Sequence, residues 1–414
     1  MSFLNLTSRI SKIINLQTFN SLHYRNFRFL FLSSVTSSVG MYMQMVAQGW
    51  LILELTDSPL SLGIVWATSQ SPSFFLGILA GTVADKVDRR KLLVLSFLVR
   101  AISAVIMGVL VTMDIIQLWH ILLIAFINGI VMVFSFPTQQ TLAVDIVGSD
   151  DAMNAISINA TGMRVIGVFG GAAAGFVIEL LGLDWPFYIM AISLLVGILI
   201  LFQIRDVERT FVPEEQSTWN SFIEGLRLIK LNQIVLVLMI ITLICEILGF
   251  SYSVVLPVFA RDVLEVGAIG LGMFNTAASI GGLIGGLTLA SLGNYKYKGR
   301  LILGIFCLFG VFLILFSQSP WYLVSLFFLG MLGFTSSAMD AMGHTILQLN
   351  VSDEQRGRAM GLWMMSIGFG PIGSLTIGGI ASLLGAPLAV TINGSLIIVT
   401  FIFLIILVPK LRSI

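Results

Sequence analysis

The chain has 414 residues, of which 57% are hydrophobic and only 10% are charged, and its formal net charge at pH 7 is +1. A water-soluble domain has about 25% charged residues, so this composition excludes an ordinary soluble domain, and the near-zero net charge gives no reason to expect a nucleic-acid partner. The two cysteines, Cys245 and Cys307, lie in apolar runs, which argues against a disulfide framework.

Residues 1–26 are expected to form a cytoplasmic amphipathic leader. No apolar core precedes a small-residue cleavage site, so the segment does not resemble a cleavable signal. Its apolar residues recur at roughly helical spacing with Arg9 and Lys12 between them, which predicts a helix on the inner membrane surface. A disordered leader fits the same residues. The apolar positions are Leu4, Leu6, Ile10, Ile13, Ile14 and Phe19.

Twelve apolar runs follow the leader, each long enough to cross a hydrocarbon core of about 30 Å. They predict an all-α membrane protein with twelve transmembrane helices. The predicted spans are 27–53, 59–84, 92–113, 117–146, 153–181, 185–204, 233–258, 268–293, 300–317, 320–349, 355–384 and 388–408. The longest polar connection, residues 205–232, is expected to be a cytoplasmic linker between an N-terminal six-helix bundle, residues 27–204, and a C-terminal one, residues 233–410.

Basic residues indicate the orientation of these spans. Of the 22 lysines and arginines, Arg100 and Arg164 fall within helices and Arg261 falls in an outer connection, if both ends of the chain are inside. All others fall in the inner connections and the tails, as the positive-inside rule requires. The sequence therefore predicts a multi-pass protein of a bacterial inner membrane with both termini in the cytoplasm.

The two predicted bundles repeat each other weakly. A shift of 203 residues aligns Asp150-Asp151 with Asp353-Glu354 and Gly167 with Gly370. A shift of 209 residues aligns Leu62-Gly63 with Leu271-Gly272. Parallel six-helix repeats around a site at the bilayer midplane are a common transporter plan, so we interpret the repeat as a duplication.

The connection after the second span has the most specific motif, Gly-Thr-Val-Ala-Asp-Lys-Val-Asp-Arg-Arg-Lys over residues 81–91. It is similar to the loop signature of the major facilitator superfamily at Gly81, Ala84, Asp85, Arg89 and Arg90. The departures are Val83, Lys86 and Asp88, where the signature has leucine, arginine and glycine.

A cytoplasmic gate is one interpretation of this loop. Asp85 at a helix end can accept hydrogen bonds from the first amides of a facing helix, and Arg89 and Arg90 can pair with Asp145. We expect these contacts to form when the bundles close on the cytoplasmic side, and Asp85→Asn to impair transport without preventing insertion. A basic turn that only fixes orientation is the alternative.

Further residues resemble the drug:proton antiporter-3 group, which contains enterobactin-type and macrolide-type exporters. They are Met43-Gln44, Gly49-Trp50-Leu51, the run from Glu54 to Leu60, and Arg356-Gly357-Arg358. The resemblance covers about residues 25–410 and implies the major facilitator fold, alternating access and export driven by protons. The antiporter signature Gly-Pro-x-x-Gly-Gly is incomplete, because Val168 replaces its proline and Ala172 its last glycine.

Ionisable residues inside predicted spans are the candidates for proton coupling, since each costs at least about 2.5 kcal/mol to insert. Glu246 lies near the middle of the seventh span, and a desolvated carboxyl favours its protonated form. Asp340 and His344 lie four residues apart, hence on one helix face, where they can share a proton or neutralise each other. For all three residues, structural packing is the alternative.

Other polar or soft residues are candidates for a substrate cavity. Gln44 and Gln48 lie one turn apart, and Asn128 lies in the fourth span; cavity hydrogen bonding and contacts between helices fit them equally. Arg164 can contact an anionic substrate or a structural partner. Met339 can offer a soft apolar surface or act as membrane filler.

The sequence therefore predicts a secondary active transporter that exports an amphipathic small molecule, such as a drug, siderophore or metabolite, in exchange for protons. A facilitator or symporter is the alternative within transport, and a membrane sensor or assembly partner is the alternative outside it. No nucleotide-binding loop, zinc-ligand spacing or nucleophile motif occurs, so no enzyme activity, cofactor or metal is expected. The expected partners are the substrate, protons and the bilayer, and the chain is expected to be a monomer that binds no nucleic acid.

Overall fold

The structure is a computed structural model that describes residues 16–205, 207, 232–292, 295, 297–351, 363, 366 and 368–407. The side chains of residues 16–18, 78–86, 290 and 407 lie outside this description. So do most of the predicted leader and all but the ends of the predicted linker.

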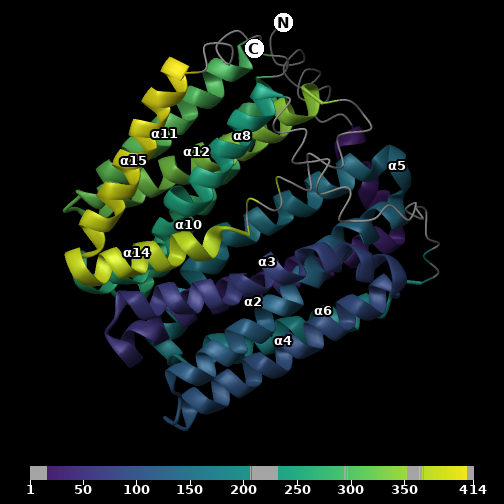
Figure 1. The fold of residues 1–414 in the computed structure, drawn as a ribbon. Coiled ribbons are helices and arrows are strands. Elements are labelled where there is room, and N and C mark those ends of the chain that lie inside the picture. The colour runs from purple at the N-terminus through teal and green to yellow at the C-terminus, as the bar shows by residue number, and fades with distance from the viewer. Residues whose placement is uncertain are drawn as a thin grey trace, which may run out of the picture.

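All regular elements in the described ranges are helical (Figure 1). In the N-terminal half they are η1 (Leu16–His23), α2 (Arg25–Thr56), α3 (Pro59–Lys86), α4 (Arg89–Thr112), α5 (Leu118–Leu181) and α6 (Trp185–Leu201). In the C-terminal half they are α8 (Gln233–Ile244), η2 (Cys245–Gly249), η3 (Phe250–Val255), α9 (Leu256–Val258), η4 (Phe259–Val263), α10 (Gly267–Ser291), α11 (Lys298–Ser317), α12 (Tyr322–Leu349), α14 (Gly370–Leu384) and α15 (Ala386–Leu407).

Eight helical segments of the described chain are long and apolar enough to cross a membrane. One of them, α5, has 64 residues and contains the backbone break at Gly148, whose φ of 80° and ψ of 174° interrupt the helix. The predicted spans 117–146 and 153–181 lie on either side of this break. The chain is therefore a multi-pass membrane protein.

The two halves lie side by side and meet along two helix pairs (Figure 1). Within the N-terminal half, α2 packs against α5 and α6, and within the C-terminal half, α12 packs against α10 and α11. Between the halves, α5 packs against α10, and α3 packs against α14. We call the surface formed by these two pairs the junction.

Glycines allow the backbones to touch at the junction. A Cβ atom on Gly272 of α10 would lie 2.3 Å from the carbonyl oxygen of Gly171 of α5. A Cβ atom on Gly63 of α3 would lie 2.4 Å from the carbonyl oxygen of Ser374 of α14. Small residues at such contacts let membrane helices approach closely without a bulky side chain between them.

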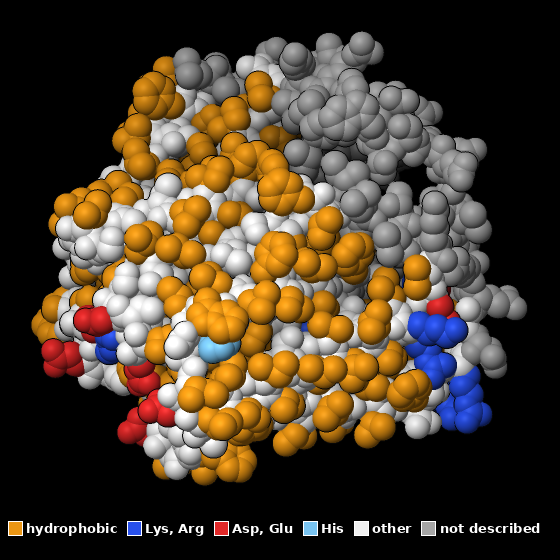
Figure 2. Space-filling model, turned by 60° about the horizontal axis from the view of Figure 1, so that its bottom comes forward, with side chains coloured by type: hydrophobic (Ala, Val, Ile, Leu, Met, Phe, Trp, Pro, Cys, Tyr) orange, Lys and Arg blue, Asp and Glu red, His pale blue; other side chains and the backbone are white. Residues whose placement is uncertain are grey.

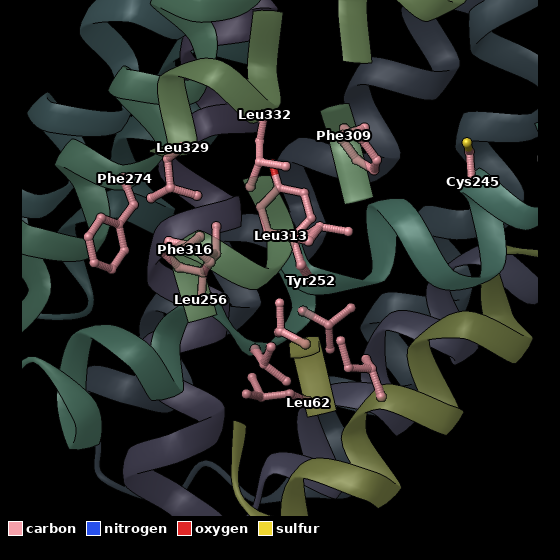
Figure 3. Close-up of a cluster of buried hydrophobic side chains, with 14 of the residues drawn as sticks. Leu62, Cys245, Tyr252, Leu256, Phe274, Phe309, Leu313, Phe316, Leu329 and Leu332 are labelled. Carbon is pink, nitrogen blue, oxygen red and sulfur yellow. The ribbon is translucent and has the colours of Figure 1, made fainter. Parts of the chain in front are cut away.

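Aromatic and aliphatic side chains form a buried cluster in the C-terminal half, which Leu62 of α3 joins from the other half (Figure 3). Phe316 of α11 is fully buried, and its ring centroid lies 4.6 Å from that of Phe259 and 6.2 Å from that of Phe274. The ring centroid of Tyr252 lies 6.4 Å from that of Phe316. This cluster fixes the irregular segment from Cys245 to Val263 against α10 and α11.

The surface is apolar along its middle and charged at its two ends (Figure 2). Large apolar side chains lie exposed there, for example Phe75 at 72% and Ile102 at 52%, as a lipid-facing surface requires. We call one end the basic end, because Arg89, Arg90, Lys91 and Arg205 lie there. The opposite end is the acidic end, with Asp57, Asp114, Asp184, Asp262 and Glu265.

Candidate functional site

Three ionisable residues from both halves lie at or beside the junction. Arg164 comes from α5, Asp340 from α12 and Glu246 from the π-helical turn η2. Asp340 interacts electrostatically with both Arg164 and Glu246. Each of the three was a separate candidate in the sequence, and their grouping depends on the fold.

Arg164 connects the two halves directly. Its Nη1 atom donates hydrogen bonds to the Gly282 carbonyl oxygen, at 3.1 Å, and to the Ser337 hydroxyl, at 2.6 Å. No carboxylate lies within ion-pair distance of Arg164 in the part of the chain that the structure describes. Its charge is therefore held by neutral oxygens and by the more distant Asp340.

Tyr42 of α2 joins this group from the N-terminal half. Its hydroxyl lies near Ser279 of α10 and interacts electrostatically with Arg164. The ring has room because Gly167 and Gly170 face it; a Cβ atom on Gly167 would lie 2.3 Å from the tyrosine hydroxyl. Tyr42 was not a candidate in the sequence, although the glycine spacing in α5 is visible there.

The backbone around Glu246 is not an ordinary α-helix. The predicted seventh span, 233–258, divides into α8, a π-helical turn that contains Glu246, a 3₁₀ segment and the short helix α9, and a second π-helical turn, η4, follows it. π-Helical turns inside helices are frequent at functional sites. The buried Asn393 side chain of α15 donates to the Leu248 carbonyl oxygen at 3.1 Å and to Ser251 at 3.0 Å, which supports this irregular segment.

A small hollow adjoins Asp340. It has a volume of about 10 Å³, room for about one water molecule. Its polar lining includes Thr242 and Asp340, and its apolar lining includes Met339 and Trp363. Met339 is buried at 5% exposure and contacts the Cys245 sulfur at 3.9 Å, so in this conformation it packs inside the C-terminal half.

His344 lies on the same face of α12 as Asp340 but points to a different partner. Its ring packs on the Trp363 ring with 4.7 Å between centroids. No hydrogen bond between His344 and Asp340 occurs among the described residues. The two side chains are neighbours without forming a proton-sharing pair here.

The remaining polar candidates lie in the N-terminal half. Gln44 and Gln48 hydrogen-bond each other at 3.0 Å. Asn128 is buried at 7% exposure, and its Oδ1 atom has no hydrogen-bond partner in the described structure. A buried oxygen without a partner costs about 1–3 kcal/mol, so Asn128 has an unused acceptor atom in this conformation.

The basic end corrects one expectation about the predicted gate. Arg89 of α4 pairs with Asp145 of α5, and both side chains are nearly buried, at 6% and 4% exposure. Both residues belong to the N-terminal half, so this pair does not close one half against the other. Arg90 does not contact Asp145; it donates to the Phe202 carbonyl oxygen at 3.0 Å and lies over the Phe202 ring.

The gate motif contains a helix cap that the sequence interpretation missed. The Asp88 carboxylate accepts hydrogen bonds from the backbone N–H groups of Arg90 and Lys91, at 3.0 and 3.1 Å, at the start of α4. Aspartate directly before an apolar helix is the signal for such a cap. Gly81 and Asp85 lie in the last turns of α3, and the Asp85 side chain is outside the described structure.

The chain matches the transmembrane secretion effector family over residues 16–414. It belongs to this family of major facilitator transporters. The staphyloferrin A transporter of Staphylococcus aureus is 26% identical, with 91% of this chain and 95% of that protein covered. The multidrug efflux pump Tap of Mycolicibacterium fortuitum is 24% identical, with 92% and 95% covered. The enterobactin exporter EntS of Escherichia coli is 22% identical, with 93% and 92% covered.

Solved structures show the same fold. A POT family transporter in complex with 5-aminolevulinic acid superposes with a TM-score of 0.77 at 10% identity, with 94% of this chain and 96% of that one covered. The nucleoside transporter NupG superposes with a TM-score of 0.70 at 17% identity, with 92% and 98% covered. The chain is therefore a membrane transporter of the major facilitator superfamily and not an enzyme.

Proposed function

We propose that this transporter exports an amphipathic small molecule from a bacterial cytoplasm in exchange for protons. The observation that carries the proposal is the group formed by Glu246, Asp340 and Arg164 at the junction. Asp340 of the C-terminal half interacts electrostatically with Arg164 of the N-terminal half and with Glu246 of its own half. A proton that binds to Asp340 therefore changes the attraction between the halves, and Glu246 acts on this attraction through Asp340.

The proposed cycle uses this attraction. With Asp340 ionised, its carboxylate attracts Arg164 and favours contact between α12 and α5. Proton binding removes the negative charge, so the halves can separate at one end and close at the other. A bound proton thus shifts the equilibrium between two conformations by its different interaction with each.

We propose that Glu246 is the residue that binds the proton and releases it when the substrate binds. It lies in a π-helical turn beside the junction and is half-buried. A desolvated carboxyl favours its neutral form, and entry of a polar substrate or of water makes release of the proton easier. The substrate would therefore enter the region around Glu246 as the proton leaves it, and the two would cross the membrane in opposite directions.

The proposed substrate is amphipathic, like the siderophores and drugs named for the relatives. Polar groups on such a molecule would meet Gln44, Gln48 and the free oxygen of Asn128. Apolar groups would meet side chains such as Met339 when the junction opens. Methionine adapts its shape to varied partners, which fits a transporter that accepts several ligands.

The proposed architecture has twelve transmembrane helices in two six-helix bundles, residues 27–204 and 233–410. The break at Gly148 divides α5 into two spans, and α14 covers the second half of the predicted span 355–384. The positive-inside rule orients the basic end toward the cytoplasm. Both termini would then be cytoplasmic, and the acidic end would face outside.

Transport by purified protein in liposomes tests this proposal. Staphyloferrin A, enterobactin and lipophilic drugs form the substrate panel, and an internal pH dye reports proton movement. The proposal expects at least one ligand to drive protons in the opposite direction through the wild-type protein but not through Glu246→Gln. Proton movement in the same direction would instead identify a symporter. Substrate flux that does not depend on the proton gradient would identify a facilitator. Substrate binding without flux would support the sensor alternative.

A further inference from the structure

Arg261 is the exception to the distribution of basic residues, and the structure gives it a specific place. It lies in η4 at the acidic end of the C-terminal half, where the other charged residues named above are acidic. Its guanidinium reaches across to α2 of the N-terminal half. The residue that departs from the positive-inside pattern thus connects the two halves.

Three acceptors hold the Arg261 guanidinium. The Nη1 atom donates to the Leu53 carbonyl oxygen at 2.8 Å, and Nη2 donates to the Asp57 carboxylate. The Nε atom donates to Asp262 in its own half at 2.6 Å. Asp262 therefore fixes the direction of the guanidinium, while Leu53 and Asp57 are the contacts that cross between the halves.

The contact on α2 is a helix C-terminus. Asp57 is the C-cap residue, with a φ of 50°, and its backbone N–H already bonds the Leu53 carbonyl oxygen. The last carbonyl groups of a helix carry partial negative charge, which a cation stabilises. Arg261 thus supplies positive charge to the end of a helix in the opposite half.

Close helix contacts surround this arginine at the same end. A Cβ atom on Gly49 of α2 would lie 2.8 Å from the Pro257 ring of α9, and one on Gly175 of α5 would lie 2.6 Å from the Ala268 carbonyl oxygen of α10. These contacts bring the two halves together at the acidic end. Opening this end must break both these close contacts and the contacts of Arg261 with Leu53 and Asp57.

We infer that Arg261, with Asp57 and the carbonyl group of Leu53, is the latch of an external gate that opens and closes once in each transport cycle. The inference rests on the proposed function for the statement that the acidic end faces outside. Arg261 is a positioning residue, because it acts through α2 and touches no substrate. The Arg261 side chain is 25% exposed but the Asp57 side chain is 85% exposed, so water screens their ion pair, and the contact with the carbonyl group of the buried Leu53 is the less screened one.

Distance measurements between spin labels test the latch without any substrate or proton gradient. Labels are placed at Met113 and Trp321, which are exposed at the acidic ends of different halves, in a chain with Cys245→Ala and Cys307→Ala. A second pair, at Lys91 and Leu349, reports the basic end. A gate that opens lengthens the first distance and shortens the second, whereas unfolding broadens both.

Two variants remove the contacts of the latch. Arg261→Gln removes the charge and the fork of donors, and we expect the ratio of open to closed acidic ends to rise about tenfold. Asp57→Asn keeps the side-chain shape and tolerates the positive φ, and we expect a rise of about threefold. The double variant should add little to Arg261→Gln, because both substitutions break the same contact.

Asp114→Asn is the matched control. Asp114 also lies at the acidic end with a φ of 55°, but it belongs to the end of α4 and its backbone bonds Val111 in the same half. It should leave both distances unchanged. Unchanged distances in Arg261→Gln, or equal effects of Asp57→Asn and Asp114→Asn, would overturn the inference. A latch that responds as expected in a protein that moves no protons would contradict the proposed function alone.

Discussion

Arg164 donates a 2.6 Å hydrogen bond to the Ser337 hydroxyl across the junction of the two halves. The same nitrogen reaches the Gly282 carbonyl oxygen at 3.1 Å. A charged donor on two neutral acceptors holds the halves together while leaving its charge available to a nearby acid. This arrangement relates the contact between the halves to the charge state of Asp340.

Arg164→Gln should therefore reduce transport by about tenfold or more, since hydrogen bonds to charged groups contribute about 1.5–3 kcal/mol. Ser337→Ala removes one acceptor and should reduce transport by severalfold. Initial rates in liposomes, normalised to the amount of inserted protein, measure both effects. Ser336→Ala is the control on the neighbouring position, and an equal loss in Ser336→Ala would contradict a specific role for Ser337.

Breaking the pair of Arg89 and Asp145 should lower stability. Both side chains are nearly buried within one half, and removal of one partner from a buried pair costs about 3–5 kcal/mol. Thermal unfolding in detergent should show a lower midpoint for Arg89→Gln and for Asp145→Asn. The double variant should be less destabilised than the sum of the two. Purely additive effects would mean that the two side chains do not stabilise each other.

Close helix packing in the C-terminal half predicts a difference between two glycines. A Cβ atom on Gly281 of α10 would lie 1.8 Å from the Gly330 carbonyl oxygen of α12, whereas a Cβ atom on Gly304 of α11 would meet nothing within 4 Å. Gly281→Ala should therefore destabilise the protein by about 1–3 kcal/mol. Gly304→Ala should be neutral or slightly stabilising, because alanine favours the helix. Equal unfolding midpoints for the two variants would refute the predicted packing.

The docking of η1 predicts an effect at the basic end. The Tyr24 hydroxyl donates to Asp151 at 3.0 Å, and Asn20 donates to the same carboxylate at 2.8 Å. The hydrogen bond to Asp151 raises the pKa of Tyr24 above its usual 10.0, so this contact is present at neutral pH and is lost as pH rises through the raised value. Tyr24→Phe should speed hydrogen exchange in residues 16–23 at pH 7. Unchanged exchange would show that the contact does not hold η1.

Much of the architecture could be predicted from the sequence because the spans are long and apolar. Helix type and approximate bounds follow from run length alone, as in α4 and α11. The π-helical turn at Glu246 could not be predicted, because it depends on contacts with Gly373 and Asn393 from helices far along the chain. The break at Gly148 is local, and the sequence predicted a connection there, between the spans 117–146 and 153–181.

The site could be predicted as single residues but not as a group. Glu246, Asp340 and Arg164 are each candidates in the sequence because the insertion of an ionisable residue into a bilayer costs free energy. Their convergence depends on which helix faces pack at the junction, which spacing within one helix does not reveal. The expected pairing of Arg89 with Asp145 was found, but its place within one half depends on how α4 packs against α5. The role of Arg261 could not be predicted, because the sequence does not show that η4 ends beside α2.

The most direct test of the account is proton movement driven by substrate in liposomes that contain wild-type protein, Glu246→Gln or Asp340→Asn. Each amide keeps the volume of its acid and cannot bind or release a proton. The account predicts that wild-type protein moves protons against the substrate, and that Glu246→Gln abolishes this movement while still allowing downhill substrate exchange. Loss of coupling in Asp340→Asn but not in Glu246→Gln would place the proton on α12 instead. Coupling at the wild-type level in both variants would contradict the account.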